Sequence, residues 1–266
     1  MPWGWWPSDA MAPEGTAPHG ARLPMVDVAR TFALANMAAF HFFRDLDTLL
    51  PAEARVAPWG FSFGPAWQAW AMGIAGGFLF LAGFSLWLGH GRRLRRSAYL
   101  RRLGVLVLAA AGVTLATYLT FPDQWVRFGI LHSIAAASMI GLAFLRLPWG
   151  VTAIAGLAAI AAGVAARSPC CEVAVLSGPT WVWLGLSPDV PYMMDWEPLL
   201  PWVGPFLLGL AAGRLADGRG WLAALSGRPA GAFWRRLGWP GRHSLTIYLI
   251  HQPVLVGLVL AWGFLA

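Results

Sequence analysis

Seven long apolar segments follow one another along this chain of 266 residues, and they constrain its fold more than any other feature. Each is close in length to the roughly 20 residues with which a helix crosses about 30 Å of hydrocarbon. Charged residues make up 12% of the sequence, which is half of the ~25% usual in soluble domains. We therefore predict an all-α, polytopic membrane protein with about seven transmembrane helices. The predicted helices cover residues 26–43, 67–88, 103–121, 128–145, 151–166, 199–215 and 244–264.

The arginines orient these helices in the membrane. The sequence contains no lysine, and arginines cluster in residues 92–102 and again in residues 214–242. Such clusters are typical of cytoplasmic loops, which predicts a cytoplasmic N-terminus and an external C-terminus. The net charge of +7 then follows mainly from this topology, with some attraction to membrane lipid. It does not indicate binding to nucleic acid.

Two domains are predicted from composition. Residues 1–24 are rich in Trp and Pro and form an N-terminal arm, and residues 25–266 form the membrane domain. A short re-entrant piece fits near residues 181–186, and a helix lying on the inner membrane surface fits between residues 221 and 239.

The first predicted helix carries ionisable residues along one face. At 3.6 residues per turn, Asp27, Arg30, His41 and Asp45 fall within an arc of roughly 60°. Each such residue inside a bilayer costs about 2.5–3.5 kcal/mol on insertion scales, so four on one face usually line a cavity or a substrate path. This polar stripe is the main functional feature of the sequence.

The external end of the bundle gathers groups suited to acid–base chemistry. His41 lies near this end of the first helix, and His132 lies about one turn inside the fourth. Two imidazoles with carboxylates nearby can deprotonate a hydroxyl or amine and can carry a transferred group. Asp45 follows His41 by one turn and can fix its tautomer. For His132 there is an alternative, because a histidine in a bundle can simply hydrogen-bond to a neighbouring helix.

Further candidates for substrate binding lie in the same external layer and in the last helix. Arg127, Asp195 and Glu197 belong to the external layer. His251 and Gln252 precede Pro253, which frees a backbone carbonyl. The two residues either answer that break in the helix or line the cavity.

Arg30, at the cytoplasmic end, allows two interpretations. It either pairs with Asp27 one turn away or faces a mouth ringed by the cluster in residues 92–102. In the second case Arg30, Arg101 and Arg102 would bind the phosphates of an anionic donor.

The sequence does not predict a metal site. No Cys/His spacing matches zinc, and no Gly-rich phosphate loop or hydrolase elbow occurs. Cys170 and Cys171 are adjacent. A disulfide between neighbours closes a strained ring, and the oxidation state of the pair is left open.

The spacing of Asp27, Arg30 and His41 resembles the first-helix signature of the membrane acyltransferase superfamily. Four other segments resemble, more specifically, bacterial proteins grouped with the catalytic domain of heparan-alpha-glucosaminide N-acetyltransferase. These segments are FLFLAGFSLWLGHGRRLRR, TYLTFPDQWVRFGILHSIA, PLLPWVGPFLLGLAAGRLA and GRHSLTIYLIHQPVL. The resemblance covers residues 22–260.

This resemblance implies a multi-pass enzyme of the bacterial inner membrane. Such an enzyme would move an acetyl or other acyl group from cytosolic acyl-CoA to a sugar amine or hydroxyl on the outer side, on an envelope sugar or glycolipid. His41 would have the acyl-transfer role, and Arg30 would lie near the donor. Thr31 stands where the superfamily usually has glycine, and no histidine lies near Trp59, where the animal enzyme's histidine is expected. An acyl-histidine intermediate and direct transfer are therefore both open.

Two other classes of protein fit the same features. A transporter or flippase-like protein could use the polar stripe as its path, although the sequence shows no inverted repeat. An inactive structural partner in envelope assembly is the other. A homodimer is an open alternative to a monomer.

Overall fold

The computed structural model describes residues 23–50, 64–168, 178–226 and 231–265. Residues 1–22 of the predicted arm, together with Cys170 and Cys171, lie outside this part of the chain. The described residues are mainly helical and form no β-strand, apart from one isolated bridge between Phe128 and Trp196. The prediction of an all-α chain is confirmed.

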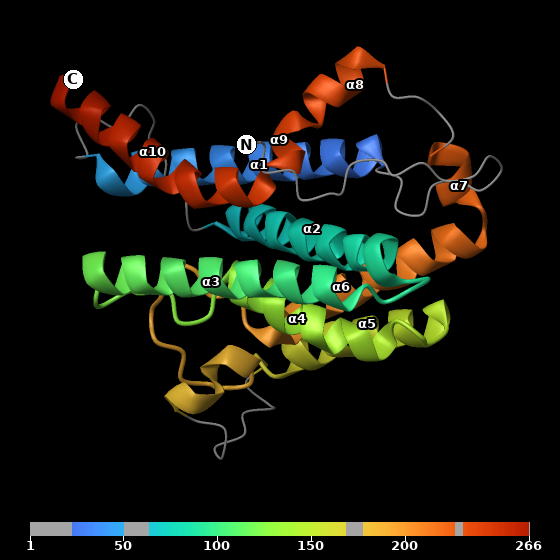
Figure 1. The fold of residues 1–266 in the computed structure, drawn as a ribbon. Helices are drawn as coiled ribbons and strands as arrows, with labels where there is room; N and C mark the ends of the chain where they lie inside the picture. Colours follow the sequence, from blue (N-terminus) through green and yellow to red (C-terminus); the bar gives the residue numbers. More distant parts are fainter. Residues whose placement is uncertain (1–22, 51–63, 169–177, 227–230, 266) are drawn as a thin grey trace.

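A long helix forms at each of the seven predicted apolar segments, and these helices run lengthwise through the molecule (Figure 1). They are α1 (Pro24–Leu49), α2 (Pro65–His90), α3 (Arg96–Thr120), α4 (Ile130–Phe144), α5 (Trp149–Ala165), α6 (Leu199–Gly218) and α10 (Ser244–Leu265).

Four of these helices are long and apolar enough to cross a membrane, namely α2, α3, α6 and α10. Helices α4 and α5 are apolar but have only 15 and 17 residues. Helix α1 has 26 residues but carries five charged side chains, and it is not among the four. A polytopic helical membrane protein is therefore supported, while the count of seven crossings and the side of the N-terminus stay predictions.

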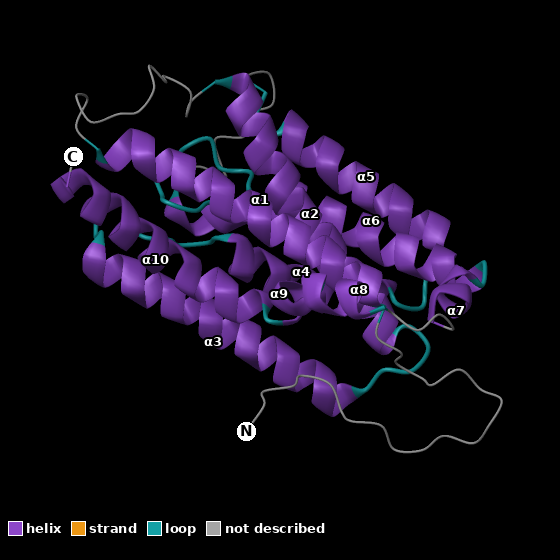
Figure 2. Ribbon diagram, turned by 90° about the horizontal axis from the view of Figure 1, so that it is seen from above, coloured by secondary structure: helices purple, strands orange, loops and turns teal. Residues whose placement is uncertain are grey.

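Helix α6 lies at the centre of the bundle and packs mainly against α2 and α5. Two glycines permit the closest approach. Gly83 of α2 faces the carbonyl oxygen of Phe206, and Gly209 of α6 faces that of Phe80, so a Cβ at either position would overlap the oxygen. Small residues at such contacts are typical of membrane helix pairs. Seen from above, α3 and α5 lie at opposite edges of the bundle (Figure 2).

Helices α1 and α10 pack together on the side of α2 that faces away from α6 (Figure 1). The short helix α9 (Trp239–Arg242) also packs on α1. The Thr31 hydroxyl lies 2.8 Å from the carbonyl oxygen of Leu237 and accepts a hydrogen bond from the Gly241 N–H at 2.9 Å. Thr31, the position where the superfamily usually has glycine, therefore attaches the segment before α10 to the first helix.

The remaining described elements are short. A 3-10 helix, η5 (Pro179–Leu184), lies near the predicted re-entrant piece. Within the predicted surface helix between residues 221 and 239, the described residues form α7 (Trp221–Ser226) and α8 (Ala232–Leu237), which is followed by α9. Gly220 before α7 has a positive φ of 75°, and Gly238 separates α8 from α9.

Candidate active site

His41 of α1 and His251 of α10 lie side by side where these two helices pack together. Their ring centroids lie 5.0 Å apart. His251 Nδ1 donates a hydrogen bond to the carbonyl oxygen of Tyr248. This bond leaves the lone pair on His251 Nε2, which can accept a proton.

Asp45 of α1 forms hydrogen bonds with Gln252, the residue of α10 that follows His251. Its carboxylate accepts hydrogen bonds from Gln252 Nε2 at 2.8 Å and 3.1 Å and from Arg44 Nη2 at 3.3 Å. Asp45 is 2% exposed, and these hydrogen bonds offset the free-energy cost of burying its carboxyl group. The hypothesis that Asp45 fixes the His41 tautomer assumed a bond between the two. In the described residues His41 Nδ1 has no partner, and the carboxylate is bonded to Gln252 and Arg44 instead.

Three buried polar atoms of this site have no hydrogen-bond partner among the described residues. They are His41 Nδ1, His251 Nε2 and Gln252 Oε1. A buried polar atom left without a partner costs about 1–3 kcal/mol, so such atoms are rare and need an explanation. Three of them on one pair of helices are well placed for a polar ligand.

Two further residues of this site were not among the sequence candidates. The positive charge of Arg44 interacts with four other groups of the site, namely His41, His251, Asp45 and Asp195. Its only signal in the sequence was its place beside Asp45, because it falls outside the polar stripe.

Tyr248 is the second residue that sequence reasoning missed. Its side chain interacts electrostatically with the Asp195 carboxyl group, and its carbonyl oxygen accepts the hydrogen bond from His251 Nδ1. Its place one turn before His251 on the same helix was the available signal. Tyr248 thereby connects the histidine pair to the carboxyl groups of the loop before α6.

Asp195 and Glu197 form a pair of carboxyl groups in the loop before α6. Asp195 Oδ2 accepts a hydrogen bond of 3.0 Å from the Ile130 N–H. This places a carboxylate at the N-terminus of α4, where the helix dipole stabilises negative charge. Glu197 lies close to Asp195 and to Arg167, whose guanidinium also stacks over Trp196 at 5.3 Å from the ring centroid.

The environment of both carboxyl groups favours their protonated forms. Burial raises the pKa of Asp195 above its ordinary value, while the bond from Ile130 and the charge of Arg44 act in the opposite direction. Burial and then the negative charge of Asp195 raise the pKa of Glu197 well above its ordinary value. Such a pair can share a proton and can bind hydroxyl or amine groups.

His132 makes contacts that fasten the start of α4. Its Nδ1 accepts from the Gly129 N–H at 3.3 Å, and its Nε2 lies 3.3 Å from Thr114 Oγ1. The Thr114 hydroxyl in turn donates to the carbonyl oxygen of Val126 at 2.8 Å. Both ring nitrogens therefore have protein partners, as the alternative of a hydrogen bond to a neighbouring helix requires.

Arg127 is exposed and lies over the Trp125 ring, with its guanidinium carbon 5.1 Å from the centroid. In the described residues this is the only contact recorded for its guanidinium, and it does not involve the histidine pair.

The arginines predicted to bind the donor differ in their contacts and exposure. Arg30 makes a 3.3 Å ion pair with Asp27 and a 2.6 Å hydrogen bond to Ser85 of α2. The charge of Arg102 on α3 interacts with that of Arg30, whereas Arg101 is exposed. The two interpretations of Arg30 are thus compatible, because the ion pair and the neighbouring arginine occur together.

The described residues contain no group of three or more His, Cys, Asp or Glu side chains arranged to hold a metal ion.

Residues 22–253 match the model of a family described as the catalytic region of heparan-alpha-glucosaminide N-acetyltransferase. The matched range contains both the histidine pair and the three arginines Arg30, Arg101 and Arg102. No curated protein and no solved structure matches the chain.

Proposed function

Since the chain belongs to the heparan-alpha-glucosaminide N-acetyltransferase catalytic-domain family, we propose that it transfers an acetyl or other acyl group from cytosolic acyl-CoA to a sugar amine or hydroxyl outside. The family supports a membrane protein with acetyltransferase-type function. The donor, an acceptor in an envelope sugar or glycolipid, and the bacterial inner membrane are our proposals.

The observation that carries this proposal is the distribution of polar groups along α1. Arg30, with Arg102 beside it, lies toward one end, and His41, with His251 beside it, lies eleven residues further on. At 1.5 Å per residue this is about 16 Å along the helix. Acyl-CoA has the same polarity, because its phosphates and its thioester are at opposite ends of an extended arm. Guanidinium groups suit the phosphates, and imidazoles suit the thioester.

Direct transfer requires one general base at the external end. His251 is suited to this role because its Nδ1 proton is held by Tyr248, so Nε2 can take the proton of the acceptor. The acceptor nitrogen or oxygen then forms a bond to the thioester carbonyl carbon, the carbon–sulfur bond breaks, and CoA leaves as a thiolate that takes up a proton.

A covalent route would use His41 as the nucleophile. An imidazole nitrogen of His41 would attack the thioester carbon and release CoA, which leaves an acyl-imidazole. The acceptor would then attack this carbonyl while His251 removes its proton, and His41 would be regenerated. The 5.0 Å between the two ring centroids is compatible with successive action on one carbonyl group.

We propose that Asp195 and Glu197 bind the acceptor. Their proximity to Tyr248, one turn before His251, would hold a sugar hydroxyl or amine next to the base. We assign His132 to holding the connection between α3 and α4, because both of its ring nitrogens are engaged there.

The proposal is tested with purified full-length protein, radiolabelled acetyl-CoA and a panel of envelope sugars and glycolipids. We expect label in an acceptor with the wild-type protein and little or none with His41→Ala. The matched control is His243→Ala, which changes a histidine that directly precedes α10 and contacts Trp239. If no acyl-CoA yields a labelled product, while the reconstituted protein moves an anionic solute across vesicles, the transport alternative replaces this proposal.

A further inference from the structure

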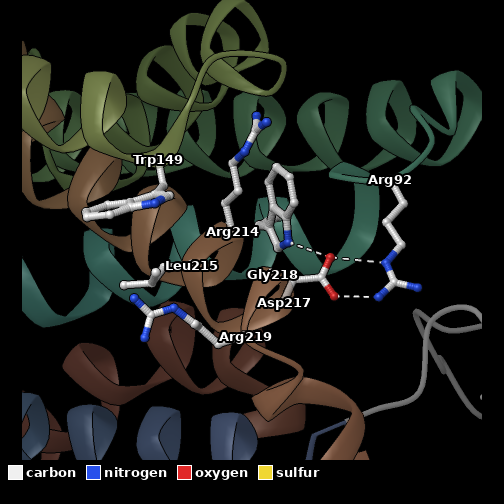
Figure 3. Close-up of a pocket in the computed structure, with 8 residues that line it drawn as sticks. Arg92, Trp149, Arg214, Leu215, Asp217, Gly218 and Arg219 are labelled. Carbon is white, nitrogen blue, oxygen red and sulfur yellow. Dashed lines mark hydrogen bonds and ion pairs between the residues drawn. The ribbon is translucent and has the colours of Figure 1, made fainter.

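A cavity of 460 Å³ lies at the C-terminal ends of α2 and α6, on the side predicted to be cytoplasmic and away from the candidate active site (Figure 3). Its walls combine three arginines with two tryptophans and one carboxylate. These residues are Arg92, Arg214, Arg219, Trp87, Trp149 and Asp217.

The single carboxylate of this cavity is fully engaged. Arg92 donates two hydrogen bonds to the Asp217 carboxylate, one of 2.6 Å from Nη2 and one of 3.1 Å from Nε. Trp87 Nε1 donates a third, of 3.2 Å, to the same carboxylate. Figure 3 shows Asp217 facing Arg92, with dashed lines for their two bonds. Asp217 therefore neutralises Arg92 and leaves the other two arginines uncompensated.

The other two arginines keep hydrogen-bond donors for a ligand. Arg214 Nη1 donates to the carbonyl oxygen of Leu145 at 3.1 Å, and its guanidinium lies 5.2 Å from the Trp87 ring centroid. Arg219 is exposed, and no side-chain hydrogen bond to the described residues is recorded for it. Guanidinium groups of this kind bind phosphate oxygens with two parallel hydrogen bonds.

The position of the cavity indicates which class of phosphate-containing ligand can reach it. It lies where the membrane-spanning candidates α2 and α6 end, at His90 and Gly218. Trp149, the first residue of α5, is 47% exposed at its edge. Tryptophan is enriched at the level of lipid headgroups, and basic side chains near that level attract the anionic lipids of the cytoplasmic leaflet.

The cavity is separate from the cytoplasmic arginines of the proposed donor site. Ser85 of α2 bonds to Arg30 on the α1 side, whereas Trp87 faces Gly213 of α6. Two residues along a helix correspond to a rotation of about 200°, so α2 itself stands between the two clusters.

We propose that this cavity binds the phosphate headgroup of an anionic phospholipid from the cytoplasmic leaflet. Arg214 and Arg219 hold the phosphate oxygens, and the exposed face of Trp149 packs against the glycerol region. The ligand is distinct from the acyl donor and from the acceptor.

The test uses the full-length protein in detergent, with dioctanoyl phosphatidylglycerol, dioctanoyl phosphatidylcholine, inorganic phosphate and CoA as separate probes. We expect phosphatidylglycerol to raise the melting temperature and to bind more tightly than phosphatidylcholine. Arg219→Glu should weaken phosphatidylglycerol binding by at least about fivefold, the factor expected for one basic residue at an anionic membrane. The matched control is Arg93→Gln, an exposed arginine of the neighbouring loop that does not line the cavity.

Three results would overturn the proposal. Equal binding of phosphatidylglycerol by the wild-type protein and Arg219→Glu would remove the cavity as the site. An equal loss in Arg93→Gln would assign the effect to diffuse charge on the loop. Stabilisation by CoA or phosphate alone, lost in Arg219→Glu, would make the cavity a site for a soluble anion.

Discussion

The rings of His41 and His251 lie 5.0 Å apart although one belongs to the first helix of the chain and the other to the last. Each ring has a buried nitrogen without a protein partner in the described residues, and the two nitrogens differ, Nδ1 in His41 and Nε2 in His251. Within the proposed function, this pair is the centre of acyl transfer.

We expect His41→Ala and His251→Ala to separate the two routes of transfer. General base catalysis contributes ~10²–10⁴-fold, so losing a base should lower the turnover rate within that range. If His41 carries the acyl group, its replacement should cost more than that, and wild-type protein quenched in acid should retain label from acyl-CoA on His41. Direct transfer predicts losses within the range and no labelled protein.

The histidine assignments also have a clear counter-result. Near-normal turnover by His41→Ala, with His243→Ala as the reference, would contradict the role of His41. A mechanism built on Asp195 or Glu197 would then be the better hypothesis.

A second prediction concerns the contact between Asp45 and Gln252. Asp45→Asn keeps the size of the side chain but replaces one acceptor oxygen by an amide that opposes Gln252 Nε2. We expect a loss of about 1–3 kcal/mol of stability and a smaller loss of turnover than in His41→Ala. Chemical denaturation and acyl-transfer assays measure the two effects. Asp123→Asn, in an exposed loop, is the control, and an equal effect there would contradict the structural role of Asp45.

Local sequence patterns were sufficient to predict the helices but not to predict which helices pack against one another. Apolar length and composition act within a segment, so all seven long helices could be predicted. The periodicity of α1 likewise brought His41 and Asp45 onto one stripe. Which helix covers that stripe depends on tertiary packing, and the contacts of Asp45 with Gln252 and of His41 with His251 therefore could not be derived.

The contacts of His132 also depend on tertiary packing and could not be derived from the sequence. Its residue type and depth matched those of a catalytic histidine. Its partners, however, are set by the geometry of the turn at Gly129 and by Thr114 on α3. Neither contact has a signature in hydropathy or spacing.

A third prediction tests the donor end of α1. If Arg30 and Arg102 bind the phosphates of CoA, a hundredfold excess of CoA over its dissociation constant should stabilise the solubilised protein by about 2.7 kcal/mol. Arg102→Gln should weaken this effect strongly, and the exposed Arg101→Gln should weaken it less. Ser85→Ala removes a hydrogen bond to Arg30 while keeping both charges, so it separates positioning from charge. Equal shifts in all variants would place the donor elsewhere.

The predicted topology is tested by labelling single cysteines with a membrane-impermeant reagent. Cys170 and Cys171 are first changed to serine, and a cysteine is then placed at Arg95 or at Asp189. We expect labelling near Arg95 only from the cytoplasm and near Asp189 only from outside, because arginine-rich loops stay inside. The opposite pattern would reverse the sides of both proposed substrate sites.

The last prediction concerns the pH dependence of stability at Glu197. Its pKa is raised in the folded protein by burial and by Asp195, so the folded state binds more protons than the unfolded state above the ordinary pKa of 4.5. Stability should therefore fall as pH rises from about 4.5 toward the raised pKa, and then level off. Glu197→Gln has no carboxyl group to deprotonate, so its melting temperature should decline less over this range. Asp189→Asn, an exposed position of the same loop, should follow the wild-type curve. Parallel curves for the wild-type protein and Glu197→Gln would show that Glu197 is not held in its protonated form by its surroundings.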